Sequence, residues 1–562
     1  MGYPDVLTSI GVRRHAVAGS PLFCDAREHG LTGDGKTNDQ PALAALVDRL
    51  GAAYAADGRA RLIYCPPGVY SIRDAGTVWR SGVSLVGAGA GATRFVLSND
   101  GNRAEPVPLA YFTAQLHGAS PTHHLAHVEF SGFEIDGSGV AMADYNPLAK
   151  GIGLQFITRG IFRDLYIHHT AATGLGCDFL QDCLIDTVLV AGCGREDDGT
   201  QMGGAGIGVG VGGWRDSVER FNITNSSAVG NATNGIFVEL QDPDQPRPLG
   251  VRIIGCHAQG NRFGISDWGM NGLIVTACTM TGNLDAGFHV SAKGTTNTAG
   301  KGGLVTDCVI DGNLRDGISI GNTPGPYTIR GNRVSGNGRY GYHHRSLGES
   351  TSEAGVAEEI IIESNDFYGN SADGIRIDRP MREAVVLNNR IRNNGRQCAP
   401  AATGGGDFVR YSERSMIDRQ AAWRDDAHRG KVLRVGRRYA VVVENNGAEL
   451  RLAPIRPGSE TSWSADTPPP GSAYELPDAP PVRAGLTINA AVDSLTIRGN
   501  RIWDSQDPQT QTYGIWITEA GSAAGCRVQD NDLVGNELGG MRLDTPPIGG
   551  RWTGNDDGSD WD

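Results

Sequence analysis

A short pattern recurs along the chain from residue 230 onward: Gly-Asn, three variable residues, Gly, and then an alternating apolar run. Residues 311–322 read DGNLRDGISIGN, and the same pattern appears as GNATNGIFVE, GNLDAGFHVS, GNSADGIRID and GNELGGMRLD. Its asparagines fall 22 to 33 residues apart and resume after one gap, at Asn231, Asn261, Asn283, Asn313, Asn337, Asn370, Asn394 and Asn536. A period of roughly 20 to 50 residues is the mark of a solenoid.

Each repeat contains two or three short strands and no helical periodicity. Branched residues fill the strands, as in EIIIES and DSLTIRG, and Gly and Asn stand at the turns. Asparagine bonds to local backbone and glycine accepts positive φ, so both suit tight turns between strands. The pattern predicts an all-β, single-stranded right-handed parallel β-helix in which the asparagines stack into a ladder.

A second series lies five residues before the first. It comprises Ser226, Cys256, Cys278, Cys308, Asn332, Asn365, Asn389 and Asn531. Equivalent positions on adjacent coils are about 4.8 Å apart. Cysteine is readily buried as a small apolar residue. The three cysteines therefore predict an inward stack of small side chains in preference to a disulfide or a metal site.

The N-terminal segment differs from the repeats. NDQPALAALVDRLGAAY places apolar residues on one face of a helix over residues 39–56, with Asn38 or Asp39 as N-cap. A solenoid needs its end covered, and this helix is expected to provide the cap.

Three motifs near the N-terminus carry a family resemblance. GLTGDGKTNDQPALAAL, LIYCPPGVYSI and GVSLVGAGAGATRF resemble the first segment of the pectate-lyase-like β-helix superfamily. That group includes polysaccharide lyases, polygalacturonase-type hydrolases, phage tailspikes and alginate epimerases. The resemblance covers residues 23–98 by motif and residues 126–546 by repeat. It implies the fold, whereas the reaction differs among families that share the scaffold.

Four segments are expected along the chain. Residues 1–98 form the N-terminal segment with the helical cap, 99–397 the parallel β-helix, 398–485 a small β-rich insertion, and 486–562 the last coils and the tail. Within the insertion, MIDRQAAWRDD predicts a short helix, and GKVLRVGRRYAVVVENNGAELRLAP predicts two or three strands with an Asn-Asn-Gly turn.

Composition restricts the classes of partner. The net charge is −13, which argues against a nucleic-acid binder, and no apolar run reaches membrane-spanning length. The N-terminus lacks the apolar core of a secretory signal, so we expect a cytoplasmic protein if the sequence is complete and a secreted one if a leader was removed. Ten cysteines in 562 residues do not form a dense disulfide framework. No cofactor or metal is predicted, and monomer and homo-oligomer remain open.

Strand alternation identifies the side chains that point outward after each repeat glycine. The first outward position gives Gly153, Gly176, Gly208, Phe237, Ser266, His289, Ser319, His343, Arg376, Trp516 and Arg542. The second gives Gln155, Asp178, Gly210, Glu239, Trp268, Ser291, Gly321, Arg345, Asp378, Thr518 and Asp544. The early glycines predict a flat floor. Acids, bases and an aromatic residue gather in the middle coils, a pattern that suits a sugar chain, with Trp268, Arg376 and Asp378 as substrate-binding residues.

Two mechanisms fit these residues. Glycoside hydrolysis needs two carboxyl groups, and Asp178 and Glu239 lie two coils apart. β-Elimination from a uronate needs a base, a cation for the carboxylate and an acid. For these roles we assign His289 or Lys293, Arg345, and Tyr342 or His343, in that order. The sequence thus predicts an enzyme that cleaves a polysaccharide or oligosaccharide, as lyase or hydrolase.

Other interpretations stay open. Arg376 with Asp378, and Arg542 with Asp544, also fit plain surface ion pairs. His168 and His169 are expected in a turn, with no functional signal. The alternatives to polysaccharide cleavage are an intracellular isomerase, cyclase or epimerase on the same scaffold, and a phage-type glycan-binding spike.

Overall fold

The structure is a computed structural model that describes residues 22–558. Gaps in this description fall at residues 195–202, 215–218, 242–249, 291–301, 322–324, 346–355, 396–400, 430, 437, 454–466 and 477–482. The chain divides into two compact units. Unit 1 comprises residues 1–261, 265–278 and 293–298, and unit 2 comprises residues 262–264, 279–292 and 299–562.

Unit 1 contains the predicted amphipathic helix near its N-terminal end. The helix α2 spans Gln40–Asp57 and buries Leu43, Leu46, Val47 and Leu50 on one face. Its N-cap is Asp39, whose carboxylate accepts from the backbone N–H groups of Thr32 and Ser71 at 2.6 and 3.1 Å. Across the described ranges, no helix is both long enough and apolar enough to cross a lipid bilayer.

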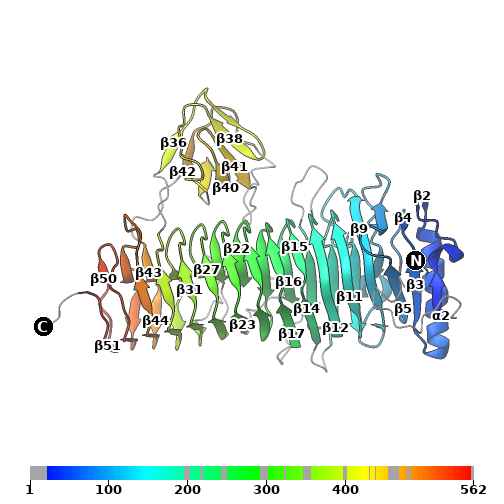
Figure 1. The fold of residues 1–562 in the computed structure, drawn as a ribbon, viewed down its shortest axis with the longest axis horizontal. Coiled ribbons are helices and arrows are strands. Elements are labelled where there is room, and N and C mark those ends of the chain that lie inside the picture. The colour runs from blue at the N-terminus through cyan, green and yellow to red at the C-terminus, as the bar shows by residue number, and fades with distance from the viewer. Residues whose placement is uncertain are drawn as a thin grey trace. The chain divides into compact units, whose positions relative to one another are not determined.

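Parallel strand pairs build the coils of unit 1 (Figure 1). Strand β9 (Glu129–Gly139) pairs with β11 (Ile161–His168), and β11 pairs with β12 (Leu175–Ala191). Strand β10 (Ile152–Thr158) pairs with β12, which pairs with β13 (Ile207–Val211) and through it with β16 (Asn234–Leu240). Each pair is parallel, as a β-helix requires.

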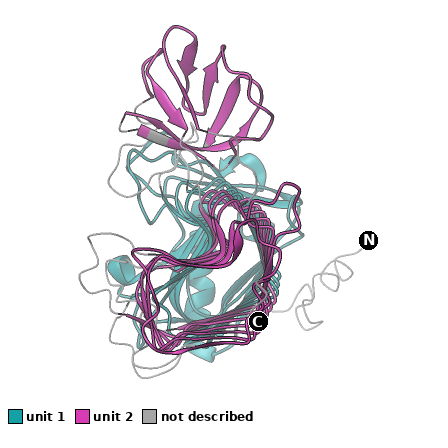
Figure 2. Cartoon of the chain, turned by 90° about the vertical axis from the view of Figure 1, so that its left-hand side faces the viewer, with its two compact units in different colours: residues 1–261, 265–278, 293–298 teal, residues 262–264, 279–292, 299–562 magenta. Residues whose placement is uncertain are grey.

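Unit 2 repeats the same arrangement, and its coils are stacked one on another in Figure 2. One face is formed by β22 (Ala286–Val290), β25 (Asp316–Ile320), β28 (Tyr342–His344), β32 (Ile375–Ile377), β43 (Ala484–Ile488), β47 (Tyr513–Ile517) and β50 (Gly539–Leu543). Successive members pair in parallel. The predicted parallel β-helix is therefore confirmed.

The asparagine ladder is present and continuous within unit 2. From Asn283 to Asn394, each buried side-chain amide donates to the Oδ1 of the next asparagine at 2.8–2.9 Å. Past the insertion, Gln511 occupies the next rung, because Asn394 Nδ2 donates to its Oε1 at 3.0 Å and it donates to Asn536 at 2.7 Å. The spacing rule overlooked Gln511 because a glutamine does not match the Gly-Asn pattern.

The second ladder is also built. In unit 1 the backbone N–H of Cys256 donates to Cys278 Sγ at 3.4 Å, so these two cysteines stack as predicted. In unit 2 the series continues through Asn332, Asn365, Asn389, Asn500, Asn531 and Asn555. The nine cysteines in the described ranges are buried free thiols.

The insertion forms a sheet of its own. Its antiparallel strands are β36 (Ala402–Gly404), β37 (Val409–Tyr411), β38 (Ser415–Asp418), β39 (Val432–Val435), β40 (Arg438–Asn445), β41 (Glu449–Ala453) and β42 (Tyr474–Leu476). The expected helix in MIDRQAAWRDD is wrong, since this segment completes β38 and continues as turns. Trp423 packs against His428 and Tyr474, so it anchors the segment without a helical face.

Candidate functional site

Strand register brings the outward residues into columns within each unit. In unit 1, Gly153, Gly176, Gly208 and Phe237 are successive partners. In unit 2 the column runs His289, Ser319, His343, Arg376, Thr487, Trp516 and Arg542. Thr487 was missed, because no Gly-Asn turn precedes its strand.

The two carboxyl groups Asp178 and Glu239 share one column of unit 1, with Gly210 between them. Gly210 pairs with Glu239 in the register of β13 and β16. On the other side, Asp178 Oδ1 accepts from the Gly210 N–H at 2.7 Å, and Asp178 Oδ2 accepts from Gln155 Nε2 at 3.0 Å. A Cβ on Gly210 would lie 2.8 Å from Asp178 Oδ1 and 2.2 Å from Gln241 Nε2. Glycine is therefore required between the two carboxyl groups.

The environments of the two carboxyl groups differ. Asp178 is buried with two N–H donors directed at its oxygens, which suits an ionised carboxylate. Glu239 is only partly buried. Burial and then the negative charge of Asp178 raise the pKa of Glu239, and the Lys150 ammonium opposes them. Two carboxyl groups in contrasting environments are a common basis for dividing acid and base roles.

The glycine column is not the open floor that the sequence predicts. A Cβ on Gly176 would lie 2.6–2.8 Å from the Cδ, Cε and Nζ atoms of Lys150, so the lysine side chain covers this glycine. The ring of Phe237 covers Gly208 in the same way, 2.4 Å from a built Cβ. The glycines thus make room for a lysine and an aromatic ring. Trp268, which is half-buried, lies against Phe237 with ring centroids 5.5 Å apart.

A third carboxyl group near Asp178 was not predicted. Glu219 is fully buried and accepts from the backbone N–H groups of Gly212, Gly213 and Trp214 at 2.8–3.1 Å. Burial outweighs these donors and, with the charge of Asp178, raises the pKa of Glu219 to about 7. Trp214 Nε1 in turn donates to the carbonyl of Phe179, next to Asp178, at 2.8 Å. Glu219 thus fixes the chain that follows β13, and no repeat or motif marks it.

His289 in unit 2 is poorly suited to act as a base. Its ring stacks on Phe263 with centroids 4.0 Å apart, and it is only 4% exposed. Arg345 Nη2 lies 3.3 Å from His289 Nδ1. Burial and then the positive charges of Arg345 and Arg262 hold the pKa of His289 well below its ordinary value. A base works best with a pKa near the operating pH.

Of the other members of the predicted elimination set, Tyr342 needs correction. Tyr342 lies in the coil interior with no exposed surface, and its hydroxyl contacts His344 Nδ1 at 3.0 Å. Burial raises the pKa of Tyr342. Tyr342 occupies the apolar slot of its strand, so the prediction that it acts on substrate is wrong. Lys293 lies outside the described residues.

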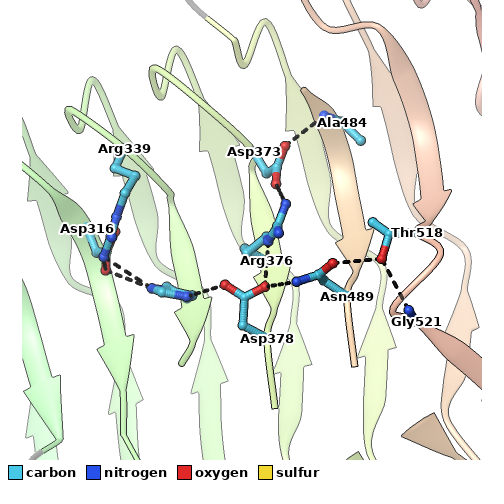
Figure 3. Close-up of polar contacts among 10 residues, drawn as sticks. Asp316, Arg339, Asp373, Arg376, Asp378, Ala484, Asn489, Thr518 and Gly521 are labelled. Carbon is cyan, nitrogen blue, oxygen red and sulfur yellow. Dashed lines mark hydrogen bonds and ion pairs between the residues drawn. The ribbon is translucent and has the colours of Figure 1, made fainter. Parts of the chain in front are cut away.

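His343 is held between two carboxylates of unit 2. Its Nδ1 lies 3.0 Å from Asp316 Oδ2 and its Nε2 lies 2.8 Å from Asp378 Oδ2. Arg339 pairs with Asp316 at 2.7 Å, and Arg376 Nε pairs with Asp378 at 2.7 Å. Figure 3 shows the two aspartates and their arginine partners on neighbouring coils. Both ring nitrogens are engaged, so His343 has no free site at which to exchange a proton with a substrate.

The series of side-chain hydrogen bonds continues past Asp378. Asp378 Oδ1 accepts from Asn489 Nδ2 at 2.8 Å, and Asn489 Oδ1 accepts from the Thr518 hydroxyl at 2.7 Å (Figure 3). Arg376 also pairs with Asp373 at 3.2 Å. Arg376 and Asp378 are therefore part of a network of internal ion pairs. The distal pair Arg542 and Asp544 has the same spacing, with Nε and Oδ1 2.8 Å apart, and its arginine side chain is 38% exposed.

Asp378→Asn is expected to destabilise the protein in a pH-dependent way. Burial alone would raise the pKa of Asp378, but the hydrogen bond from His343 and the charge of Arg376 outweigh it and lower the pKa to about 2. A lowered pKa stabilises the fold above the unfolded-state value and loses this effect as pH falls through the folded value. We expect urea unfolding to show a loss of about 1.5–3 kcal/mol at pH 7. The difference from wild type should narrow from about pH 4 toward pH 2.

Asp544→Asn is the matched control. It removes the same carboxylate from an Arg-x-Asp pair. In this pair the arginine is more exposed, and the described contacts of Asp544 include no histidine. The loss in free energy of unfolding should therefore stay within about 1 kcal/mol. Equal losses for the two variants, or a loss for Asp378→Asn that does not change with pH, would contradict this account.

Two family models match the sequence. Residues 23–172 match "Rhamnogalacturonase A/epimerase, pectate lyase-like", and residues 247–354 match "Right handed beta helix region". The first match covers the capping helix and β9 to β11, and the second covers the coils that carry His289 and His343. These matches support the resemblance to pectate-lyase-like right-handed β-helix proteins. Asp178 and Glu239 lie outside both matches, so neither model assigns them a role.

Three solved structures are similar to the chain at low identity. The A-module of the mannuronan C-5 epimerase AlgE4 from Azotobacter vinelandii is 16% identical, covers 94% of this chain and 99% of its own, and has a TM-score of 0.38. An exopolygalacturonase from Thermotoga maritima is 11% identical over 70% of this chain and 90% of its own, with a TM-score of 0.42. Tailspike protein 3 of bacteriophage CBA120 is 13% identical, covers 93% of this chain and 60% of its own, and has a TM-score of 0.45. A search of curated protein sequences gave no match.

Proposed function

We propose that the protein is a glycoside hydrolase that cleaves a polysaccharide or oligosaccharide, with Glu239 as general acid and Asp178 as general base. The observation that carries this proposal is the pair of carboxyl groups on either side of Gly210. Glu239 has a raised pKa and can hold a proton for the leaving oxygen, while Asp178 is arranged as an ionised acceptor.

The separation of the pair favours inversion at the anomeric carbon. Glu239 and Asp178 are two coils apart, which is about 10 Å between backbones. Side-chain reach reduces this toward the roughly 6.5–9.5 Å between carboxyl groups that leaves room for a water molecule in inverting enzymes. Asp178 takes a proton from this water as its oxygen attacks, and Glu239 gives its proton to the departing sugar oxygen. The products are a free reducing end and an alcohol.

The residues considered for β-elimination support that reaction less well. His289 is stacked, buried and held neutral. His343 is bonded at both ring nitrogens, and Tyr342 lies inside the coil. Of the described candidates, only Arg345 remains, as a cation without a partner base or acid.

The substrate class follows from the groups around the carboxyl pair. The half-buried side chains of Lys150 and Trp268 lie in the same unit, and an ammonium and an indole ring suit an acidic sugar chain. The name of the family that matches residues 23–172 supports a carbohydrate substrate of the pectin type. We therefore expect a uronate-containing glycan to be cleaved in preference to a neutral one.

Product analysis tests the proposal. The protein is incubated with uronate-containing and neutral polysaccharides while reducing ends and near-ultraviolet absorbance are recorded. We expect reducing ends to appear without the absorbance of a new carbon–carbon double bond. Proton NMR of the first product should show the anomer opposite to that of the substrate. Ultraviolet-absorbing products would indicate a lyase, and an altered C5 configuration without chain cleavage would indicate an epimerase. Either result would refute hydrolysis.

A further inference from the structure

Three side chains of unit 1, Asp136, His168 and His169, bring two nitrogen atoms and one oxygen atom that could bind a metal close together. Strands β9 and β11 pair with Asp136 beside His168, so register alone places these two side chains on one face. His169 follows β11 with φ 53°, which breaks strand alternation, and its Nδ1 lies 2.7 Å from His168 Nδ1. One ligand atom from each of the three residues lies within 4.8 Å of the others. The sequence predicts no role for either histidine, so this cluster emerges only from the fold.

The two ring nitrogens of His168 have different partners, a carboxylate and a second imidazole. Its Nε2 lies 3.1 Å from Glu134 Oε1, and an ionised carboxylate can only accept, so Nε2 carries the hydrogen. The lone pair of Nδ1 then points toward His169. The Tyr166 ring stacks on His168 with centroids 4.5 Å apart and fixes the orientation of the imidazole. A histidine that binds a metal through one nitrogen usually donates its other N–H to a carboxylate, as here.

The local charge favours a cation. Glu134 and Asp136 contribute two negative charges, and Arg94 pairs with both, so one negative charge remains when the histidines are neutral. Arg94 and Asp136 interact through Asp136 Oδ2. The other oxygen, Oδ1, accepts from the Ser138 N–H at 2.9 Å and lies 3.8 Å from His168 Nδ1. Arg94 thus orients the carboxylate without occupying Oδ1.

We propose that Asp136, His168 and His169 bind a first-row transition metal ion, Zn²⁺ in the first instance. Two imidazoles and one carboxylate are a common ligand set for Zn²⁺, and three protein ligands leave a fourth position for water or a ligand. Ca²⁺ and Mg²⁺ prefer oxygen ligands, so nitrogen donors favour the transition metal. His169 is exposed, so an ion can reach the site from solvent. Because the ligands come from adjacent coils, the ion would also join β9 to β11.

A cobalt titration tests the site directly. Tag-free full-length protein is dialysed against a chelator and titrated with Co²⁺, which gives visible absorption when bound by few ligands, and then with Zn²⁺. We expect one equivalent of Co²⁺ to bind and Zn²⁺ to displace it. Zn²⁺ should also raise the thermal unfolding midpoint, since a ligand that binds only the folded state stabilises it. Ca²⁺ should do neither.

Three variants sharpen the result. His169→Ala removes an exposed ligand and should abolish the cobalt spectrum and the thermal shift. Glu134→Gln keeps the three ligands and should weaken binding by about 10–100-fold. His257→Ala is the matched control, because it also removes an exposed histidine at a strand of unit 1 and should leave binding unchanged.

The outcomes are decisive in either direction. Absence of stoichiometric Co²⁺ binding by the wild type would show that the two rings form only a hydrogen-bonded pair, and would overturn the proposal. Equal binding by His169→Ala and His257→Ala would overturn it too, as would an equal thermal shift with Ca²⁺.

Discussion

Glu239→Gln is expected to lower kcat on the natural glycan by about 10²–10⁴-fold while the protein stays folded, because it removes the proton donor for the leaving oxygen. Asp178→Asn should cause a loss of the same order through the loss of the base. The two variants should differ on an aryl glycoside with a good leaving group, which needs little protonation. On that substrate Glu239→Gln should recover much of its activity, whereas Asp178→Asn should not.

The pH profile provides a second measurement for the same pair. The general acid must carry its proton, so activity falls as pH rises through the pKa of Glu239. Burial and the charge of Asp178 raise that pKa, so the alkaline limb should lie above about 4.3, the value of an ordinary glutamic acid. In Glu239→Gln the residual activity should lose this limb.

The distal pair provides the controls for this prediction. Asp544→Asn and Arg542→Ala should keep full activity, and far-ultraviolet circular dichroism should show that all four variants remain folded. Full activity in Asp178→Asn and Glu239→Gln would place the reaction elsewhere on the molecule.

Asn337→Ala is expected to cause the largest loss of stability of any variant considered. Asn337 is fully buried, and its Oδ1 accepts from both the backbone N–H and the Nδ2 of Asn313, at 3.0 and 2.9 Å. Alanine leaves these two donors buried without a partner, at about 1–3 kcal/mol each, so the free energy of unfolding should fall by roughly 2–6 kcal/mol. Urea unfolding measures this loss.

Two further variants show whether the ladder is the cause. Asn337→Gln should lose less than Asn337→Ala, because Gln511 already serves as a rung between Asn394 and Asn536. Arg330→Ala, an exposed change on the same coil, should stay within about 0.5 kcal/mol. A loss below 1 kcal/mol in Asn337→Ala would show that the rungs contribute little to stability.

The sequence predicted residue positions correctly in the parts of the chain where the coils repeat. A strand alternates its faces and a β-helix stacks its coils in register, so one asparagine per turn fixes which residues share a column. This logic correctly aligned Gly208 with Phe237 and His343 with Arg376. It also marked the helix that begins after Asp39.

The site's detailed chemistry could not be predicted in the same way, because it depends on residues outside the repeat. Lys150 precedes β10 and reaches over Gly176 from outside the alternating strand positions. Asp316 stands before the repeat glycine, so the alternation rule did not pair it with His343. Glu219 follows residues with no repeat signal, and its burial is visible only in three dimensions. Tyr342 was assigned as a candidate acid although the same rule places it in an inward slot, where the structure has it.

The hydrogen bond between Asn389 and Asn500, which lie on either side of the insertion in sequence, shows how a β-helix can accept an inserted domain. Asn365 and Asn389 close a rung 24 residues apart, whereas Asn389 and Asn500 close an equivalent one 111 residues apart. For a flexible chain, the closure entropy grows only with the logarithm of loop length, so the longer loop costs about 1.4 kcal/mol more. One buried amide pair can offset a cost of that size. The turn after Asn394 is thus a position where a foreign domain can be grafted, while the coils before and after it keep their register.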